Sequence, residues 1–313
     1  MNDIKTIGIV GRGQIGASLA TLFSGNGYEV ILLGSHDTGV NKGEIEISHN
    51  FDELISEGIM DEKQKAVCMS KVRYTYSYED LSGIDFCYEA VTEDVEIKRD
   101  VYQKVEQCCQ EDIVIASATS AISADVLGNL LVHKERFLVA HPWNPAHVVP
   151  LVEVCKSQHT DEAAVKITED LLNDVGKKVV TLNKNIEGFI GNRLQHALFR
   201  EAMYLIDEGI ATPEQIDDVV YYSFGQRYSS IGIFEHYDAA GLPLQKEVQS
   251  NLFPTLCNTD QPQKCLISHI EAGELGARTK RGVLDWSKID EEDFRKRQRK
   301  PFYRFIQWNF PEE

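Results

Sequence analysis

Short, strongly apolar runs alternate with amphipathic stretches through about the first 185 residues, and this alternation leaves few folds open to the chain. Some runs are continuously apolar, as in Ile113–Ala116, which is typical of parallel strands covered on both faces. Strand followed by helix, repeated along the chain, predicts a doubly wound α/β domain with a parallel sheet. The expected strands are Thr6–Val10, Glu29–Leu33, Lys71–Tyr76, Ile84–Val91, Ile113–Ser117, Phe137–His141, Val148–Cys155 and Lys178–Leu182. The expected helices lie near Gln14–Ser24, Val95–Gln110, Ser123–Leu131 and Asp161–Val175.

From Gly188 onward the strand pattern ends, and apolar residues recur at helical spacing. This spacing predicts one long helix over Phe189–Asp207. The segment Thr212–Gln215 predicts the start of another helix, with a threonine N-cap, a proline at the first helical position and a glutamine three residues after the cap. The charged run Asp290–Lys300 is expected to be a solvated helix face. We therefore expect two domains, an α/β domain over residues 1–186 and an all-α domain over residues 187–313.

The charge balance excludes some classes of partner. The chain has 49 acidic residues against 32 lysines and arginines, a formal net charge of −17. A protein this acidic is a poor binder of nucleic acid and of anionic membranes. No apolar stretch approaches the roughly 20 residues of a membrane-spanning helix, and no signal-peptide pattern opens the chain, so we expect a cytoplasmic protein. The seven cysteines are scattered without zinc spacing, which predicts reduced packing residues and no metal site.

A glycine motif lies between the first expected strand and the first expected helix. The run Gly11-Arg12-Gly13-Gln14-Ile15-Gly16 has the G-x-G-x-x-G pattern. In this context Gly11 permits a tight turn, Gly13 lets the backbone approach a pyrophosphate, and Gly16 lets helix and strand pack closely. The helix that opens at Gln14 and Ile15 offers free N–H groups to phosphate oxygens. The motif therefore predicts a dinucleotide cofactor, NAD or NADP.

The choice between these two cofactors is left open by the second strand. An acidic residue at its carboxyl end would grip the adenine ribose, but this strand ends in Gly34-Ser35-His36. Without that acid, the repulsion that excludes a 2′-phosphate is lost. Ser35, His36 and Arg12 are polar or basic groups that could contact such a phosphate.

A histidine and a glutamate are the candidate catalytic pair. His141 ends one expected strand, in the run His141-Pro142-Trp143-Asn144-Pro145, and Glu153 lies twelve residues on, in the next strand. If the two strands are neighbours, the carboxylate can hold the imidazole and fix its tautomer. The other ring nitrogen is then a general base suited to an alcohol substrate.

These features together resemble the L-3-hydroxyacyl-CoA dehydrogenase family over nearly the whole chain. The likeness rests on matched segments whose order and spacing agree with the family. Besides the glycine motif and the His141–Pro145 run, the matching segments are Tyr88–Glu93 with Lys98, Ala116–Ser120, Leu151–Val154, Glu187–Leu194, and Gly273–Gly276 with Arg281 and Gly282.

The resemblance implies roles for the matched positions. His141 would be the catalytic base and Glu153 its orienting partner, while Ser120 and Asn192 would hydrogen-bond the reacting oxygen. The family further implies a homodimer formed through the helical domain and an active site between the domains. The positions that match the lining of the family's cofactor site are Glu93 and Lys98.

Departures from the family pattern bear on the substrate. Ala118 replaces a common Asn, Gly34 replaces an Asp, and the stretch 41–65 is acidic and broken by glycines where acyl-CoA members carry a lysine-rich helical pair that helps hold CoA. Such an acidic surface disfavours the binding of CoA, which is negatively charged. The run Phe224–Tyr228 resembles the branch with L-gulonate 3-dehydrogenase, lambda-crystallin and carnitine dehydrogenase, and Arg227 within it could bind a carboxylate through two hydrogen bonds.

We therefore expect an NAD(P)-dependent dehydrogenase that converts a 3-hydroxyl to a 3-oxo group by hydride transfer. The favoured substrate is a small free 3-hydroxy acid of gulonate or carnitine type, with Arg227 and Asn144 as substrate-binding residues. One alternative is a short 3-hydroxyacyl-CoA such as 3-hydroxybutyryl-CoA. Another is a dinucleotide-binding protein without catalysis, against which the set His141, Glu153, Ser120 and Asn192 argues.

Overall fold

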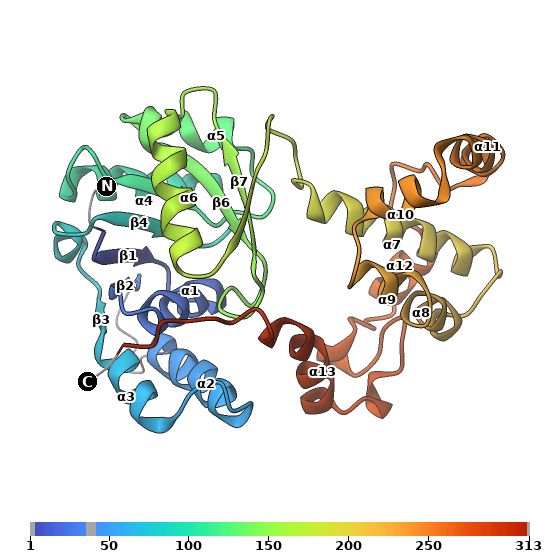
Figure 1. The fold of residues 1–313 in the computed structure, drawn as a ribbon, viewed down its shortest axis with the longest axis horizontal. Helices are drawn as coiled ribbons and strands as arrows, with labels where there is room; N and C mark the ends of the chain where they lie inside the picture. The colour runs from blue at the N-terminus through green and yellow to red at the C-terminus, as the bar shows by residue number, and fades with distance from the viewer. Residues whose placement is uncertain (1–3, 36–41, 312–313) are drawn as a thin grey trace. The chain divides into compact units, whose positions relative to one another are not determined.

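The computed structural model describes residues 4–35 and 42–311, and its first part is built on one eight-stranded sheet. The strand order is β3-β2-β1-β4-β5-β6-β7-β8 (Figure 1). Neighbouring strands are parallel except β6 and β7, which are antiparallel. The strands are β1 (Thr6–Val10), β2 (Glu29–Leu33), β3 (Val72–Thr75), β4 (Phe86–Glu89), β5 (Val114–Ser117), β6 (Phe137–Pro142), β7 (Leu151–Lys156) and β8 (Lys178–Thr181). All eight expected strands are present, and the predicted doubly wound α/β fold is confirmed.

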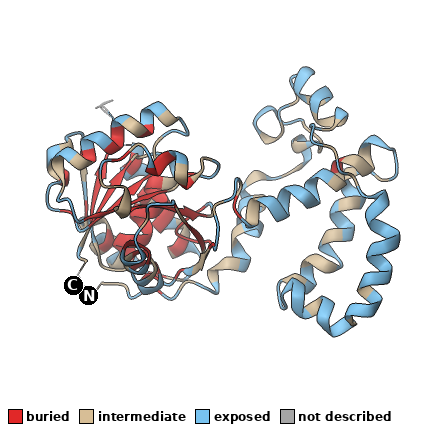
Figure 2. Ribbon diagram, turned by 90° about the horizontal axis from the view of Figure 1, so that it is seen from above, coloured by how far each residue is buried: buried red, intermediate tan, exposed pale blue. Residues whose placement is uncertain are grey.

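Helices cover both faces of this sheet because successive strand residues point to opposite sides. Ile9 of β1 packs in a core with α1, α2, α6 and the C-terminal Trp308, whereas the next residue, Val10, packs in a second core with α4 and α5. Buried residues accordingly concentrate along the strands (Figure 2). The helices of this part are α1 (Gln14–Gly25), α2 (Lys42–Ser56), α3 (Glu62–Ser70), α4 (Val95–Cys108), α5 (Ala124–Gly128) and α6 (Glu162–Asp174).

The sequence predicted that glycines interrupt the stretch 41–65, and the structure differs from this prediction. From Lys42 onward it forms the helical pair α2 and α3, because Gly43 lies in the first turn of α2 and Gly58 lies in the turn between the helices. Asp61 caps α3 by accepting the backbone N–H of Gln64, whose side chain in turn accepts the backbone N–H of Asp61. The helical pair is therefore present in this chain. It is acidic, as expected, because residues 41–65 contain seven Asp and Glu residues and three Lys residues.

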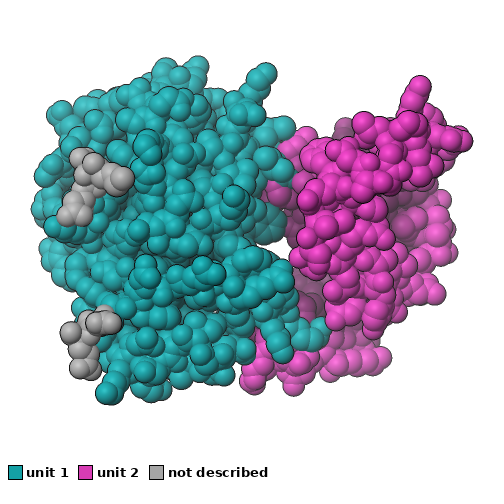
Figure 3. Space-filling model, in the orientation of Figure 1, with its two compact units in different colours: residues 1–190, 297–313 teal, residues 191–296 magenta. Residues whose placement is uncertain are grey.

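The chain divides into two compact units, coloured separately in Figure 3. The first comprises the chain up to Ile190 together with the segment from Arg297 onward, and the second is Gly191–Lys296. The division therefore differs from the expected 1–186 and 187–313 at its C-terminal end. Trp308 packs against Gly25 of α1, and Arg299 and Tyr303 both bond Glu53 of α2, so the last segment is part of the first unit's core.

The second unit consists of helices without a closed core. The predicted long helix begins at Gly191 rather than at Phe189, because Phe189 has a left-handed backbone with φ of 49°. The capping box at Thr212 is present and starts α8 as predicted. Within residues 191–296, all of which the structure describes, Met203 is the only buried residue. The helices are α7 (Gly191–Asp207), α8 (Pro213–Tyr221), α9 (Phe224–Tyr228), α10 (Ile233–Ala240), α11 (Leu242–Leu252), α12 (Lys264–Glu271) and α13 (Glu291–Tyr303), the last of which extends into the first unit.

Two features are absent from the described residues. Among residues 4–35 and 42–311, no helix has the length and apolarity needed to cross a membrane. The same residues contain no group of three or more His, Cys, Asp or Glu side chains placed to hold a metal ion.

Candidate active site

The antiparallel pairing of β6 and β7 brings the two candidate catalytic side chains together. His141 and Glu153 lie directly opposite each other in the register, and the His141 Nδ1 is 3.2 Å from the Glu153 Oε2. Both side chains are buried, with 8% and 2% of their surfaces exposed. A carboxylate accepts only, so Nδ1 carries the hydrogen and Nε2 keeps its lone pair. The arrangement therefore gives His141 the tautomer that a general base needs.

Glu153 is held by two further donors. Its Oε2 also accepts the Trp143 indole N–H at 3.2 Å, and its Oε1 accepts the backbone N–H of Ile190 at 2.9 Å. A buried carboxylate that is satisfied in this way keeps a fixed orientation. The sequence indicated neither Trp143 nor Ile190 as a partner, because both contacts depend on how the loop after β6 and the connection after β8 fold over β7.

Phe189 is a second residue that the sequence did not single out. Its ring stacks on the His141 imidazole with centroids 5.1 Å apart, and it is buried. Its φ of 49° is rare for a bulky residue and costs on the order of 1–2 kcal/mol. The adjoining Gly188 also has a positive φ, 74°, so the chain turns sharply here and presents the ring to the histidine. Stacking leaves the imidazole little freedom to rotate.

The glycine loop after β1 fits a dinucleotide phosphate. Gly11 has a φ of 110°, and a Cβ there would lie 2.4 Å from the Ala90 carbonyl oxygen. A Cβ on Gly16 would meet the Gly11 carbonyl oxygen at 1.8 Å, whereas one on Gly13 would meet nothing within 4 Å. The N-terminus of α1 has no side-chain cap and no acidic residue in its first turn, where Gln14 and Ile15 lie. Its backbone N–H groups are therefore suited to receive phosphate oxygens.

Arg12 lies across the end of β2, where Gly34 replaces the acidic residue that would bind the adenine ribose. A Cβ on Gly34 would be 2.8 Å from the Arg12 Nε, and the Arg12 Nη1 donates to the Tyr76 hydroxyl at 2.8 Å. The guanidinium also lies over the Tyr76 ring, 4.9 Å from its centroid. Ser35 is exposed beside Gly34, and His36 lies outside the described residues. Among the residues that the structure describes, this end of β2 is therefore lined by the Arg12 cation.

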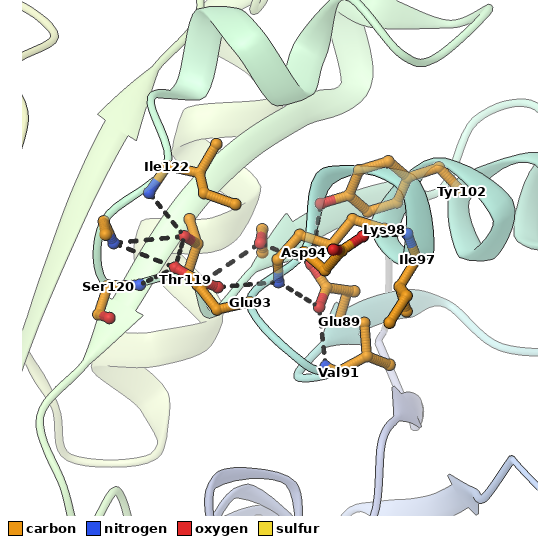
Figure 4. A network of polar contacts seen from close by, with 12 residues as sticks. Glu89, Val91, Glu93, Asp94, Ile97, Lys98, Tyr102, Thr119, Ser120 and Ile122 are labelled. Carbon is orange, nitrogen blue, oxygen red and sulfur yellow. Dashed lines mark hydrogen bonds and ion pairs between the residues drawn. The ribbon is translucent and has the colours of Figure 1, made fainter.

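Ser120 follows β5 on a turn that Glu93 holds. The Glu93 Oε1 accepts the Thr119 hydroxyl and the backbone N–H groups of Ser120 and Ala121, the last two at 3.1 and 3.2 Å (Figure 4). The other oxygen of Glu93 is 3.3 Å from the Lys98 Nζ. Burial acts to raise the pKa of Glu93, but the hydrogen bond from Thr119 and the charge of Lys98 together hold it below its usual value. Lys98 is itself buried, so its ammonium meets carboxylates within the protein.

Asn144, Asn192 and Arg227 are the remaining candidate residues. Asn144 is exposed on the loop after β6. Asn192 is the second residue of α7, in the second unit. Arg227, on α9 of the same unit, is exposed and bonds the His236 Nε2 at 3.1 Å, so one of its donors is already used and its guanidinium is held by α10.

Comparisons with known proteins agree with the fold and the motifs. The family model of the 3-hydroxyacyl-CoA dehydrogenase NAD-binding domain matches residues 6–186, and that of the family's C-terminal domain matches residues 188–286. The chain is 29% identical to 5-formyl-3-hydroxy-2-methylpyridine 4-carboxylate 5-dehydrogenase of Mesorhizobium japonicum, covering 90% of each chain. A solved structure of an enzyme with that activity, described as an NAD+-dependent dismutase, superimposes with a TM-score of 0.87 at 27% identity, covering 96% of this chain and 97% of that one.

Two further relatives differ in substrate. L-carnitine dehydrogenase/betainyl-CoA thioesterase of Rhizobium meliloti is 32% identical over 77% of this chain, which spans about half of that longer protein, 48%. The structure of (S)-3-hydroxybutyryl-CoA dehydrogenase of Ralstonia eutropha is 31% identical, with a TM-score of 0.76 and coverage of 91% and 100%. The chain therefore belongs to the 3-hydroxyacyl-CoA dehydrogenase family, as an oxidoreductase that acts on CH–OH groups and carries the family's NAD-binding domain.

Proposed function

We propose that the protein reversibly oxidises the 3-hydroxyl of a small free hydroxy acid, of gulonate or carnitine type, to a 3-oxo group. The observation that carries this proposal is the buried pair of His141 and Glu153, opposite each other on β6 and β7. A general base with a fixed tautomer is what removal of a hydroxyl proton requires. Bound NAD supplies the hydride acceptor.

The protein's own residues then have distinct tasks. His141 Nε2 takes the hydroxyl proton during oxidation and returns it in the reverse direction. Glu153 keeps the proton on Nδ1 and stabilises the charged imidazole. Ser120 and Asn192 donate hydrogen bonds to the reacting oxygen, where negative charge develops. The uncapped N-terminus of α1 binds the cofactor phosphates, and Glu93, with Lys98 behind it, lines the same edge of the sheet.

The substrate class follows from charge. CoA carries several phosphate charges, and the α2–α3 pair, which in acyl-CoA members is lysine-rich, is acidic here. A free carboxylate instead matches the guanidinium of Arg227, whose position is fixed by His236. Two relatives support this choice by name, one acting on a pyridine 4-carboxylate and one on L-carnitine. The 3-hydroxybutyryl-CoA dehydrogenase relative supports the alternative, a short acyl-CoA ester.

Removing the Arg227 charge separates these substrate classes. We expect Arg227→Met to raise KM for a free 3-hydroxy acid by about 10- to 100-fold, the effect of losing a charge-assisted hydrogen bond, and to leave KM for the CoA ester unchanged. Steady-state kinetics with both substrates measure this, and Arg278→Met, another exposed arginine of the second unit, is the matched control. An unchanged KM for free acids would contradict the role of Arg227, and turnover of CoA esters alone would establish the acyl-CoA alternative.

The cofactor site should also accept a 2′-phosphate, because Arg12 lies where the missing acid would be. We expect NADPH to bind within about tenfold of NADH, and Arg12→Met to weaken NADPH by about tenfold while NADH changes little. Calorimetric titration gives both dissociation constants. Lys71→Met, at the opposite end of β2 where Lys71 pairs with Glu29, controls for loss of one positive charge. A hundredfold preference of the wild-type protein for NADH would contradict this proposal.

A homodimer formed through the second unit is the state that its surface favours. A helical unit must bury its apolar faces somewhere, yet this one buries Met203 alone and has an apolar cavity of about 580 Å³ lined by Leu198, Leu205 and Val219. We expect light scattering at micromolar concentration to give twice the chain mass. Phe234→Glu, at a site 84% exposed in the single chain, should weaken the dimer, whereas Val132→Glu, 78% exposed in the first unit, should not. A monomeric wild-type protein would refute this state.

A further inference from the structure

A buried lysine lies between two carboxylates beneath the turn that carries Ser120. The Lys98 Nζ is 2.7 Å from the Glu89 Oε1 and 3.3 Å from the Glu93 Oε2, and 1% of the lysine side chain is exposed (Figure 4). Glu89 is fully buried at the end of β4. Burying an ion pair seldom adds much stability, since the desolvation of both charges offsets their attraction. The pair therefore calls for an explanation other than stability.

Each carboxylate oxygen of Glu89 accepts two hydrogen bonds. Its Oε1 accepts the backbone N–H of Val91 at 2.8 Å as well as the lysine, and its Oε2 accepts the hydroxyls of Tyr102 at 2.8 Å and Ser117 at 2.6 Å. These donors come from the loop after β4, from α4 and from β5. Glu89 is consequently immobile, and it fixes where the ammonium of Lys98 can lie.

Lys98 then determines the position of Glu93. Unlike Glu89, Glu93 is partly exposed, with 37% of its side chain accessible, so without the lysine only its contacts with the Thr119–Ala121 turn would restrict its rotamer. With one oxygen held by Lys98, the other accepts the Thr119 hydroxyl and the N–H groups of Ser120 and Ala121. The contacts form a chain from the buried end of β4 to the exposed turn after β5.

This chain of contacts lies at the functional edge of the sheet. Glu89 and Ser117 are the last residues of β4 and β5, and β4 adjoins β1, where the strand order reverses direction. In doubly wound sheets, ligands bind outside the carboxyl ends of the strands at that point. A turn at this edge must be held accurately if its side chain is to meet a reacting atom.

We propose that Glu89 and Lys98 are positioning residues, which hold Glu93, and through it the Thr119–Ala121 turn, in the conformation that presents Ser120 to the substrate. The link to substrate rests on the function proposed above for Ser120. Neither side chain of the buried pair touches the substrate in this account, and each acts through Glu93.

The test replaces the pair as a unit, since removing one partner alone would leave a buried charge unpaired. In Glu89→Gln/Lys98→Met, we expect amide exchange of a peptide spanning residues 117–123 to accelerate by about tenfold or more, because Glu93 no longer holds the two N–H groups. We expect kcat to fall by about tenfold while KM for the substrate changes little, as for an interaction made in the transition state. Hydrogen exchange by mass spectrometry and steady-state kinetics measure the two effects.

Asp100→Asn/Lys104→Met is the matched control, because it removes an exposed ion pair of the same helix, α4, and leaves the contacts among Glu89, Lys98, Glu93 and the turn in place. It should keep wild-type exchange over residues 117–123 and a wild-type kcat. If the double variant does not fold, Glu93→Ala removes the contacts of Glu93 with both Lys98 and the turn and should accelerate the same exchange. Exchange over residues 117–123 that stays within about twofold of wild type in the folded variant would overturn the proposal. Faster exchange with unchanged kcat would uphold the positioning of the turn and contradict the role of Ser120 in catalysis.

Discussion

The buried carboxylate of Glu153 is the interaction on which the arrangement of the site depends. From β7 it joins two other parts of the chain, since it accepts from His141 and Trp143 at and just after the end of β6, and from Ile190 before α7. That junction exists because β6 and β7 are antiparallel in an otherwise parallel sheet, which places the two residues directly opposite each other. A parallel pairing would need a crossover between the strands and would separate them in the chain.

Glu89 is a second buried carboxylate that accepts hydrogen bonds from several segments. Glu89 satisfies donors from the loop after β4, from α4 and from β5, and its lysine partner carries the constraint outward to the turn after β5. Glu89 is the last residue of β4, whereas Glu153 is the third residue of β7, and at both buried positions an apolar side chain would avoid the free energy of desolvating a carboxylate. Apolar cores lie on both faces of the sheet beside these two carboxylates.

Much of this could be predicted from the sequence, because continuous apolar runs and a period-2 register are local signals. The strands, the glycine loop and the pairing of His141 with Glu153 are examples. The α2–α3 helical pair could not be predicted in the same way. Its glycines lie at the start of a helix and in a turn, and the sequence alone does not distinguish glycines at these positions from glycines that interrupt a helix. Trp308 belongs to the core of the first unit because it packs against Gly25. These two residues lie near opposite ends of the chain, so local sequence patterns do not predict the contact. The position of Arg12 over Gly34 likewise needs three-dimensional structure.

The proposed role of His141 as the general base is tested most directly by kcat of the NAD-dependent oxidation in His141→Ala. We expect a loss of at least about 10²-fold, the usual contribution of a general base, with the dissociation constant of NAD unchanged. His133→Ala is the matched control, because His133 also faces a carboxylate, Glu135 at 3.6 Å, outside the site. A His141→Ala protein that is folded, binds NAD and turns over at close to the wild-type rate would contradict the account.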